Sequence, residues 1–319
     1  MNDKTKCFML GEDTETFGKG RKMTIPTLDD LKKELVETCE CDTTKEWKKL
    51  QLYDASQNKR SFCGNKIVYK HYFLALNETR YKNGKTLWEK YEENPEKMWM
   101  DVCKMDRRKG RDPSVRDLFE KNRAIAFFKP STAKFLTQHF QAKKVFDPCA
   151  GWGGRSLGVV SAGAKYFGHD TNPKVKECHD AMWKDIMPVI VSAGACPSTI
   201  REGSCLSPHL MWEKHFDLAL TSPPYANLEV YEGMTPFKDD DDYYKNFLLP
   251  MMKKCEEMVK AGGHLAINIS PKIYEKLTKT YKYRECDTKI DFLQQMGQKS
   301  GKKEDFVYVW KVPIVVKFD

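Results

Sequence analysis

The pattern that most constrains the fold starts at about residue 126, where short apolar runs begin to alternate with amphipathic stretches. This alternation is typical of an α/β domain, in which parallel strands are joined by crossover helices. The expected strands end at or near five residues, namely Phe146, Asp170, Arg201, Leu220 and Ile269. A last alternating run, residues 306–312, predicts a strand at the edge of the sheet, preceded by a hairpin turn at residues 299–304.

The chain has 319 residues and exceeds a typical single domain of roughly 100–200 residues, so a second region is expected. Residues 85–105 and 113–128 have helical apolar spacing, whereas residues 66–77 fit either a strand pair or a helix. We therefore predict two parts, a mainly helical N-terminal region, residues 1–125, and an α/β domain, residues 126–319.

Cysteine usage and hydropathy bear on the compartment. The 11 cysteines are scattered and the N-terminus is too polar for a signal peptide. No apolar run approaches the roughly 20 residues that span a bilayer, so we expect an intracellular protein, cytoplasmic or nuclear, without a membrane partner. Cys39, Cys41, Cys63 and His71 lack the paired spacing of structural zinc ligands, and no metal is expected.

A net charge of +9 favours a polyanionic partner such as a nucleic acid. The densest basic cluster supplies five candidates for phosphate contacts, Lys104, Arg107, Arg108, Lys109 and Arg111. Residues 272–289 interleave tyrosines with basic side chains, as nucleic-acid grooves do, and add Lys279, Lys282 and Arg284. The alternatives are a solvated helix edge for the first segment, and an amphipathic helix followed by a strand for the second.

A glycine-rich loop follows the first expected strand, at residues 147–155, where a helix should begin. Glycines at Gly151, Gly153 and Gly154 would let the backbone approach a ligand without Cβ clashes. The loop lacks the Gly-Lys-Ser/Thr of a phosphate-binding loop, which disfavours ATP. Asp170 ends the second strand, where an acid accepts hydrogen bonds from ribose hydroxyls in doubly wound folds. Together these features predict a nucleoside ligand without a bound phosphate chain.

A second loop, Thr-Ser-Pro-Pro-Tyr at residues 221–225, follows the fourth expected strand. Each proline lacks an N–H group and restricts the residue before it to extended geometry, so carbonyl groups are free to face a pocket. A planar primary amine could donate one hydrogen to the Ser222 hydroxyl and another to the Pro223 carbonyl, while Tyr225 stacks on the ring. The alternative, a rigid turn without function, is less favoured beside the glycine loop.

These segments, in the order FDPCAGWGGR, GHDTNP, TSPPY and AGGHLAINIS, resemble the S-adenosylmethionine-dependent amino-methyltransferases that modify exocyclic nitrogens of cytosine or adenine in DNA. The resemblance covers roughly residues 126–319. It implies a class I (Rossmann-like) methyltransferase fold with a central, mostly parallel seven-stranded sheet. It also implies S-adenosyl-L-methionine as the cofactor, DNA as the partner, and attack of the amine of a flipped base on the methyl group.

The resemblance further implies roles for individual residues. Its catalytic loop is Ser222, Pro223, Pro224 and Tyr225. The methionine end and the backbone-facing side of the cofactor would be bound by Lys129, Pro130, Ser131, Asp147, Pro148, Cys149, Ala150, Gly151 and Gly153. Asp170 would hold the ribose, and Gly203 with Ser204 would flank the adenine.

Some residues depart from the family pattern. Trp152 is bulkier than the usual residue between the glycines, and Asp170 stands where glutamate is more common. The chain leaves no room for a large recognition domain in the usual places, so target recognition is expected from residues 1–125, assisted by the tail. A serine at the head of the loop resembles the cytosine N4 subgroup more than the adenine N6 subgroup. Cytosine C5 methylation is disfavoured because the catalytic loop has no cysteine.

Two alternatives come from other classes of protein. The same loop can process an amine on RNA, so the chain could be an RNA-base amino-methyltransferase. It could also be a catalytically silent, nucleic-acid-binding subunit that uses the same fold as a scaffold, although the intact loops argue against this.

Overall fold

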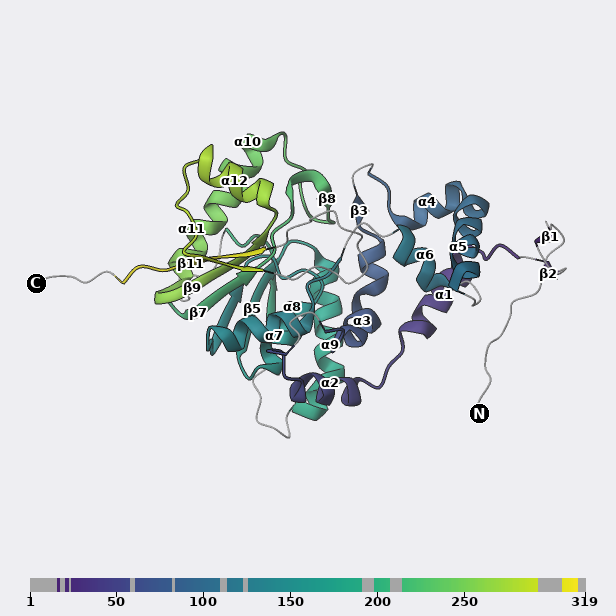
Figure 1. Cartoon of the computed structure of the whole chain (residues 1–319), viewed down its shortest axis with the longest axis horizontal. Helices are drawn as coiled ribbons and strands as arrows, with labels where there is room; N and C mark the ends of the chain where they lie inside the picture. Colours follow the sequence, from purple (N-terminus) through teal and green to yellow (C-terminus); the bar gives the residue numbers. More distant parts are fainter. Residues whose placement is uncertain are drawn as a thin grey trace, which may run out of the picture. The chain divides into compact units, whose positions relative to one another are not determined.

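The structure, a computed structural model, describes residues 16–17, 21–22, 24–57, 61–81, 84–109, 114–122, 126–190, 198–206, 214–291 and 306–314 (Figure 1). They belong to two compact units. The first comprises the described parts of residues 1–38 and 86–123, and the second those of residues 39–85 and 124–319.

The first unit is mainly helical, as predicted for the N-terminal region. Its elements are β1 (Thr16–Phe17), β2 (Arg21–Lys22), α1 (Leu28–Cys39), α4 (Leu87–Glu93), α5 (Pro95–Lys109) and α6 (Val115–Asn122). The start of α4 is fixed by a capping box in which Thr86 and Glu89 exchange side-chain and backbone hydrogen bonds. The rings of Trp88 and Phe119 meet edge to face with centroids 5.3 Å apart and pack α4 on α6.

The second unit is built on a seven-stranded sheet. Its strands are β4 (Lys144–Asp147), β5 (Lys165–Asp170), β6 (Thr199–Glu202), β7 (Phe216–Thr221), β9 (Val259–Ile269), β10 (Thr288–Asp291) and β11 (Phe306–Lys311). They lie in the order β10-β11-β9-β7-β4-β5-β6, and β11 runs antiparallel to both of its neighbours. This order with one reversed strand is that of the class I (Rossmann-like) methyltransferase fold, which confirms the predicted fold class.

Helices cover both faces of this sheet (Figure 1). One face carries α7 (Pro130–His139), α8 (Gly154–Ser161) and α9 (Pro173–Ile190), and the other carries a π-helix, η4 (Tyr243–Leu248), with α11 (Leu249–Met258) and α12 (Pro271–Lys279). A short helix, α10 (Asp240–Asp242), leads into η4, and Asp239 caps it by accepting a hydrogen bond from the Asp242 N–H, as predicted for the acidic run. No described helix is long and apolar enough to cross a membrane.

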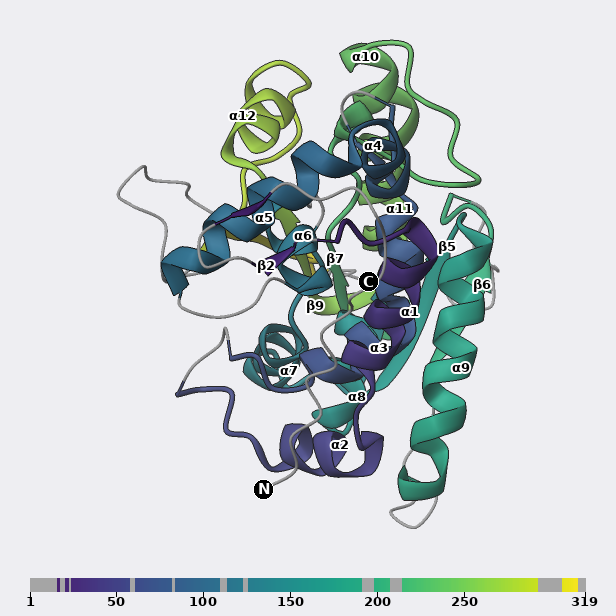
Figure 2. The ribbon, with the colours of Figure 1, turned by 90° about the vertical axis from the view of Figure 1, so that its right-hand side faces the viewer.

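The compact units do not follow the expected division at residue 126. Two helices from the N-terminal half, α2 (Thr43–Leu52) and α3 (Asn65–Asn77), belong to the second unit, where they pack on α8 and α9 (Figure 2). Trp47 of α2 meets Trp183 of α9 edge to face. The buried Lys134 ammonium donates to the carbonyls of Leu50, Gln51 and Tyr53, each at 2.8 Å, and so satisfies the end of α2.

Most of the expected strands are confirmed, with one correction at the sheet edge. Residues 306–312 were predicted at the edge, but β11 lies between β9 and β10, and β10 forms the edge. The sequence of β10 is short and largely exposed, so apolar alternation did not reveal it. The expected hairpin turn at residues 299–304 lies outside the described residues. The ambiguous segment 66–77 is helical, as part of α3.

The contact of α7 with α8 depends on glycine. A Cβ atom added at Gly158 would lie 2.2 Å from the Pro130 carbonyl oxygen and 2.6 Å from the Ala133 Cβ atom. Helix α7 and the residues before it therefore rest directly on the backbone of α8, which fixes the chain entering α7 against the start of α8.

We predict that Gly158→Ala lowers the free energy of unfolding by roughly 1–3 kcal/mol, because the new methyl group forces the two backbones apart. Urea denaturation measures the change. Ser161→Ala, a half-buried position at the end of the same helix, is the matched control and should have a smaller effect. Equal stability of Gly158→Ala and the wild type would contradict the packing described.

Candidate functional site

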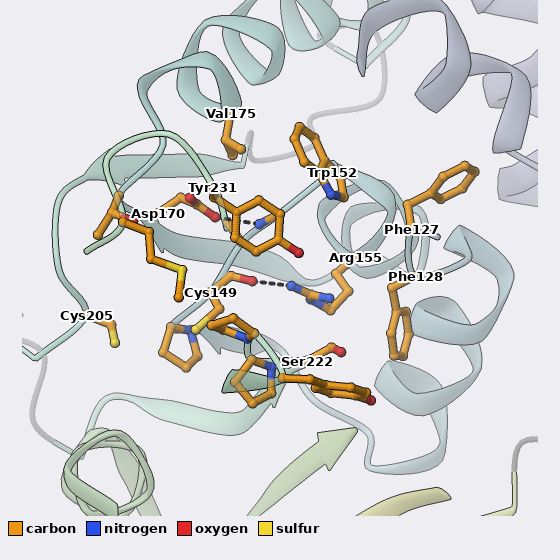
Figure 3. Close-up of a pocket in the computed structure, with 18 of the residues that line it drawn as sticks. Phe127, Phe128, Cys149, Trp152, Arg155, Asp170, Val175, Cys205, Ser222 and Tyr231 are labelled. Atoms are coloured by element: carbon orange, nitrogen blue, oxygen red, sulfur yellow. Dashed lines mark hydrogen bonds between the residues drawn. The ribbon is translucent and has the colours of Figure 1, made fainter. Parts of the chain in front are cut away.

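A cavity of about 610 Å³ opens in the second unit at the carboxyl ends of β4, β5, β6 and β7 (Figure 3). Asp170 at the end of β5 lines it. So do residues that follow the four strands, namely Pro148, Cys149, Ala150, Gly151, Trp152, Thr171, Gly203, Ser204, Cys205, Ser222, Pro223, Pro224 and Tyr225. The carboxyl ends of parallel strands meet at one edge of the sheet, which is where α/β folds bind ligands. The glycine loop and the proline loop predicted from the sequence therefore share one cavity.

The Asp170 carboxylate joins the loops after β4 and β5. Its Oδ2 atom accepts a hydrogen bond from the Gly151 N–H at 2.8 Å, and its Oδ1 atom accepts one from the Asn172 N–H at 3.0 Å. Burial raises the pKa of Asp170 to about 6, although these two backbone donors lower it. A carboxylate on the cavity wall thus has fixed geometry and a charge that additional hydrogen-bond donors would stabilise.

Asp147, predicted to bind the cofactor, is fully buried and is not part of the cavity wall. Its Oδ2 atom accepts hydrogen bonds from Arg155 Nε at 2.6 Å and from the Tyr166 hydroxyl at 2.7 Å. Its Oδ1 atom accepts one from the Cys149 N–H at 3.2 Å, and Arg155 also donates to the Cys149 carbonyl. Asp147 therefore fixes the backbone of the glycine loop from the protein interior, outside the cavity.

The glycines of the loop serve different purposes. Gly151 has a φ of +56° and lines the cavity beside Asp170. A Cβ atom at Gly153 would lie 2.3 Å from the ring of Tyr72, and one at Gly154 would lie 1.8 Å from the Phe128 carbonyl oxygen. The close neighbours of Gly153 and Gly154 are thus parts of the protein itself, and Gly153 lies outside the cavity wall.

The proline loop is held by residues of other elements. The Ser222 hydroxyl donates to Oδ1 of Asn268 at 3.2 Å, and the Tyr225 hydroxyl donates to the Asn268 carbonyl at 3.5 Å. The Tyr243 hydroxyl, at the start of η4, donates to the Pro224 carbonyl at 3.0 Å. Sequence reasoning missed Asn268 and Tyr243. A polar residue inside the buried run Leu265–Ile269 was the available signal for Asn268.

Aromatic side chains form much of the remaining wall, among them Phe127, Phe128, Trp152, Tyr231, Phe237 and Phe247. Tyr231, from the segment after the proline loop, packs on Trp152 with ring centroids 5.9 Å apart (Figure 3). The same segment touches the loop after β5, because a Cβ atom at Gly233 would lie 2.3 Å from the Thr171 carbonyl oxygen. The sequence did not predict that the segment with Tyr231 and Gly233 forms part of the cavity wall.

The segment before α7 meets the cavity in part. Lys129 lines the cavity, whereas Pro130 and Ser131 are buried outside its wall. The Ser131 hydroxyl donates to the Ser61 carbonyl at 2.8 Å and links α7 to the loop before α3. Of the predicted cofactor residues, the cavity brings together Lys129, Pro148, Cys149, Ala150, Gly151, Asp170, Gly203 and Ser204.

The predicted nucleic-acid contacts fall into two groups. In the first unit Lys104 is exposed on α5, the side chains of Arg107, Arg108 and Lys109 are outside the described part of the chain, and so is Arg111. In the second unit Lys279 pairs with Glu275 at 2.7 Å, and Arg284 pairs with Glu256 at 3.2 Å and Asp287 at 3.3 Å, whereas Lys282 is exposed. Intramolecular acids thus neutralise part of this second group.

No protein family and no curated protein match the chain by sequence. Similar solved structures include a putative class I S-adenosylmethionine-dependent methyltransferase from Listeria monocytogenes, with 15% identity over 86% of this chain and 90% of that chain and a TM-score of 0.44. An rRNA methylase from Streptococcus thermophilus has 11% identity over 59% of this chain and 99% of that chain, with a TM-score of 0.36. An S-adenosylmethionine-dependent O-methyltransferase from Thermotoga maritima has 14% identity over 65% of this chain and 74% of that chain, with a TM-score of 0.39. At these identities the likeness concerns the fold alone.

Asp170 should make the stability of the protein depend on pH. Because folding raises its pKa from 3.8 to about 6, its contribution to stability is fully present below 3.8 and is lost as the pH rises through about 6. We predict that the melting temperature of Asp170→Asn, relative to the wild type, rises between about pH 4 and pH 7. Thermal unfolding at constant ionic strength measures it.

Asp180→Asn is the control with the opposite sign. Desolvation raises the pKa of the Asp180 carboxylate, but hydrogen bonds from Lys176 and His179, together with the charges of these two side chains, outweigh it and lower the pKa overall. Its melting temperature relative to the wild type should not rise over the same interval. A constant difference for Asp170→Asn would show that the Asp170 carboxylate is not destabilised by burial.

Proposed function

We propose that this chain transfers a methyl group from S-adenosyl-L-methionine to the exocyclic amine of a base in DNA, and that cytosine N4 is favoured over adenine N6. The observation that carries the proposal is that one cavity of a class I methyltransferase fold contains both Asp170 with Gly151 and the Ser222–Tyr225 loop. The first pair suits a nucleoside, and the second suits a planar amine.

The cavity fits the cofactor in size and chemistry. Its volume of about 610 Å³ lies within the range of small-molecule sites. Asp170 would accept hydrogen bonds from the ribose hydroxyls, and these donors would stabilise a carboxylate whose pKa burial raises to about 6. A Cβ atom at Gly203 would meet no atom of the described residues within 4 Å, so the backbone there, beside Ser204, leaves space in which the adenine ring would lie. Lys129 and the β4 loop would face the methionine end.

The proline loop would overcome the poor nucleophilicity of an aromatic amine. The bound cofactor supplies an electrophilic methyl group on its sulfonium. Ser222 already donates its hydroxyl hydrogen to Asn268, so its oxygen is left to accept one amine hydrogen, and the Pro223 carbonyl would accept the other. These two contacts would localise the nitrogen lone pair and aim it at the methyl group. The N–C bond would form as the S–C bond breaks, and one amine proton would be released to water.

Cysteine chemistry is not needed for this reaction. Cys149 lies in the cavity wall, but a hydrogen bond with Cys205, together with burial, raises the pKa of its thiol well above the usual value. Cys149 would therefore remain a neutral thiol rather than a nucleophile. In a duplex the target base would be flipped into the cavity at a cost of a few kcal/mol and would stack on Tyr225.

DNA is proposed as the partner because of the net charge of +9 and the basic side chains of the first unit, with Lys104 exposed on α5. Residues 1–125 are proposed to contribute target recognition. The RNA-base alternative uses the same loop chemistry. A silent binding subunit is less favoured, because the cavity retains both an ionisable ribose partner and the acceptors of the proline loop.

Mass spectrometry of nucleosides from DNA and RNA incubated with the protein and labelled cofactor tests the proposal. We expect labelled 4-methylcytosine from DNA. Labelled 6-methyladenine would overturn the choice of base, and label in RNA alone would overturn the choice of DNA. Absence of transfer together with absence of cofactor binding by calorimetry would favour the silent subunit.

Substitutions should separate chemistry from cofactor binding. Ser222→Ala should lower kcat by about 100-fold, because it removes an acceptor of the amine, while the Kd for S-adenosylmethionine stays nearly unchanged. Asp170→Ala should raise that Kd by roughly 10-fold to 100-fold, because hydrogen bonds to a charged group are lost. Calorimetry and single-turnover transfer measure the two effects, and the reverse pattern would refute both assignments.

A further inference from the structure

We infer that Asn268 is a positioning residue, which makes the Ser222 hydroxyl a hydrogen-bond acceptor toward the target amine. The inference rests on the proposed amino-methyltransferase function and adds a residue outside the proline loop to its machinery. Asn268 lies on β9, lines the cavity and is only 8% exposed.

A serine hydroxyl can act toward an amine either as a donor or as an acceptor, and Asn268 decides between the two. A hydroxyl group has one hydrogen to donate and two lone pairs to accept with. If the hydrogen pointed toward the amine, two donors would face each other and the amine would be turned away. Oδ1 of Asn268, 3.2 Å from the Ser222 oxygen, takes this hydrogen and leaves the lone pairs for the amine.

The orientation of the Asn268 amide is itself fixed. Its Nδ2 atom donates to the Phe306 carbonyl at 3.0 Å, across the antiparallel pair of β9 and β11. A flipped amide would place its oxygen against the Phe306 carbonyl and its NH₂ group against Ser222, so the hydrogen-bond network selects one orientation. The hydrogen of Ser222 is therefore directed by a chain of contacts that ends in the backbone of β11.

Asn268 also contacts the other end of the proline loop. The backbone carbonyl of Asn268 accepts the hydrogen bond from the Tyr225 hydroxyl at 3.5 Å. The Pro224 carbonyl already accepts a hydrogen bond from the Tyr243 hydroxyl. Among the described residues, no group donates to the Pro223 carbonyl. The loop thus keeps two acceptors for an amine with two hydrogens, the Ser222 oxygen and the Pro223 carbonyl.

A double-mutant cycle on the full chain tests the inference. Asn268→Ala should lower kcat by about 10-fold to 100-fold, because the Ser222 hydroxyl is no longer oriented, and should leave cofactor Kd unchanged. In the Ser222→Ala background the same substitution should change kcat by less than about 2-fold, because the hydroxyl it orients is gone. Asn268→Asp, which has the same shape and keeps an acceptor oxygen, should have a kcat between those of Asn268→Ala and the wild type.

Asn77→Ala is the matched control. Asn77 is also buried and donates its Nδ2 hydrogen to a backbone carbonyl, that of Phe73 at 2.6 Å, but it lies outside the cavity wall. Its substitution should lower the melting temperature with little effect on kcat. Calorimetric binding of S-adenosylmethionine shows that each variant is folded.

The outcomes distinguish the two levels of the proposal. If the wild type transfers no methyl group to nucleic acid, the proposed function fails, and the inference fails with it. If the wild type is active but Asn268→Ala has equal effects with and without the Ser222 hydroxyl, or Asn268→Asp is as impaired as Asn268→Ala, the function stands and the positioning role is overturned.

Discussion

The buried carboxylate of Asp147 is the interaction on which the site depends. It is the common acceptor for Arg155 of α8, Tyr166 of β5 and the backbone of the β4 loop. Burying an ion pair is unfavourable unless every polar atom finds a partner, and breaking one by removing a single partner typically costs about 3–5 kcal/mol. Because Arg155 also donates to the Cys149 carbonyl, this pair sets the path of the glycine loop, and hence the place where Gly151 meets Asp170.

The residues that line the cavity come from two sets of strands, β4 to β6 and β7. The loops after β4 and β6 and the end of β5 present Gly151, Gly203 and Asp170, to which we assign the nucleoside in the proposed function. The loop after β7 presents the acceptors that we propose for an amine. The first set is held by the Asp170 carboxylate, which bonds to the Gly151 N–H, and by the pair of Asp147 with Arg155 of α8. The second set is held from outside, by β9 and by η4. Since π-helical turns often occur at functional sites, the placement of Tyr243 at the start of η4 agrees with its contact to the loop.

The sequence predicted the parts of the fold that local patterns encode. Apolar runs revealed β4, β5, β6, β7 and β9, and the order of the strands then brought the two loops together. It did not show why Gly153 and Gly154 are glycines, because Tyr72 and the Phe128 carbonyl are brought to them only by packing. For the same reason it did not place α2 and α3 in the second unit, since their apolar faces do not reveal which helices they cover.

The role proposed for Asn268 was not predictable from the sequence, for a chemical reason as well as a geometric one. A carboxylate at the head of such a loop is an acceptor only, and needs no partner to define its role, whereas a serine hydroxyl is both donor and acceptor. If the loop accepts an amine, as proposed, a serine at its head requires a second group that takes the hydroxyl hydrogen. That group must lie on an element that does not move with the loop, and Asn268 meets this condition because its amide is bonded across β9 and β11. The identity of Ser222 and the polar residue in a buried strand are thus two parts of one requirement.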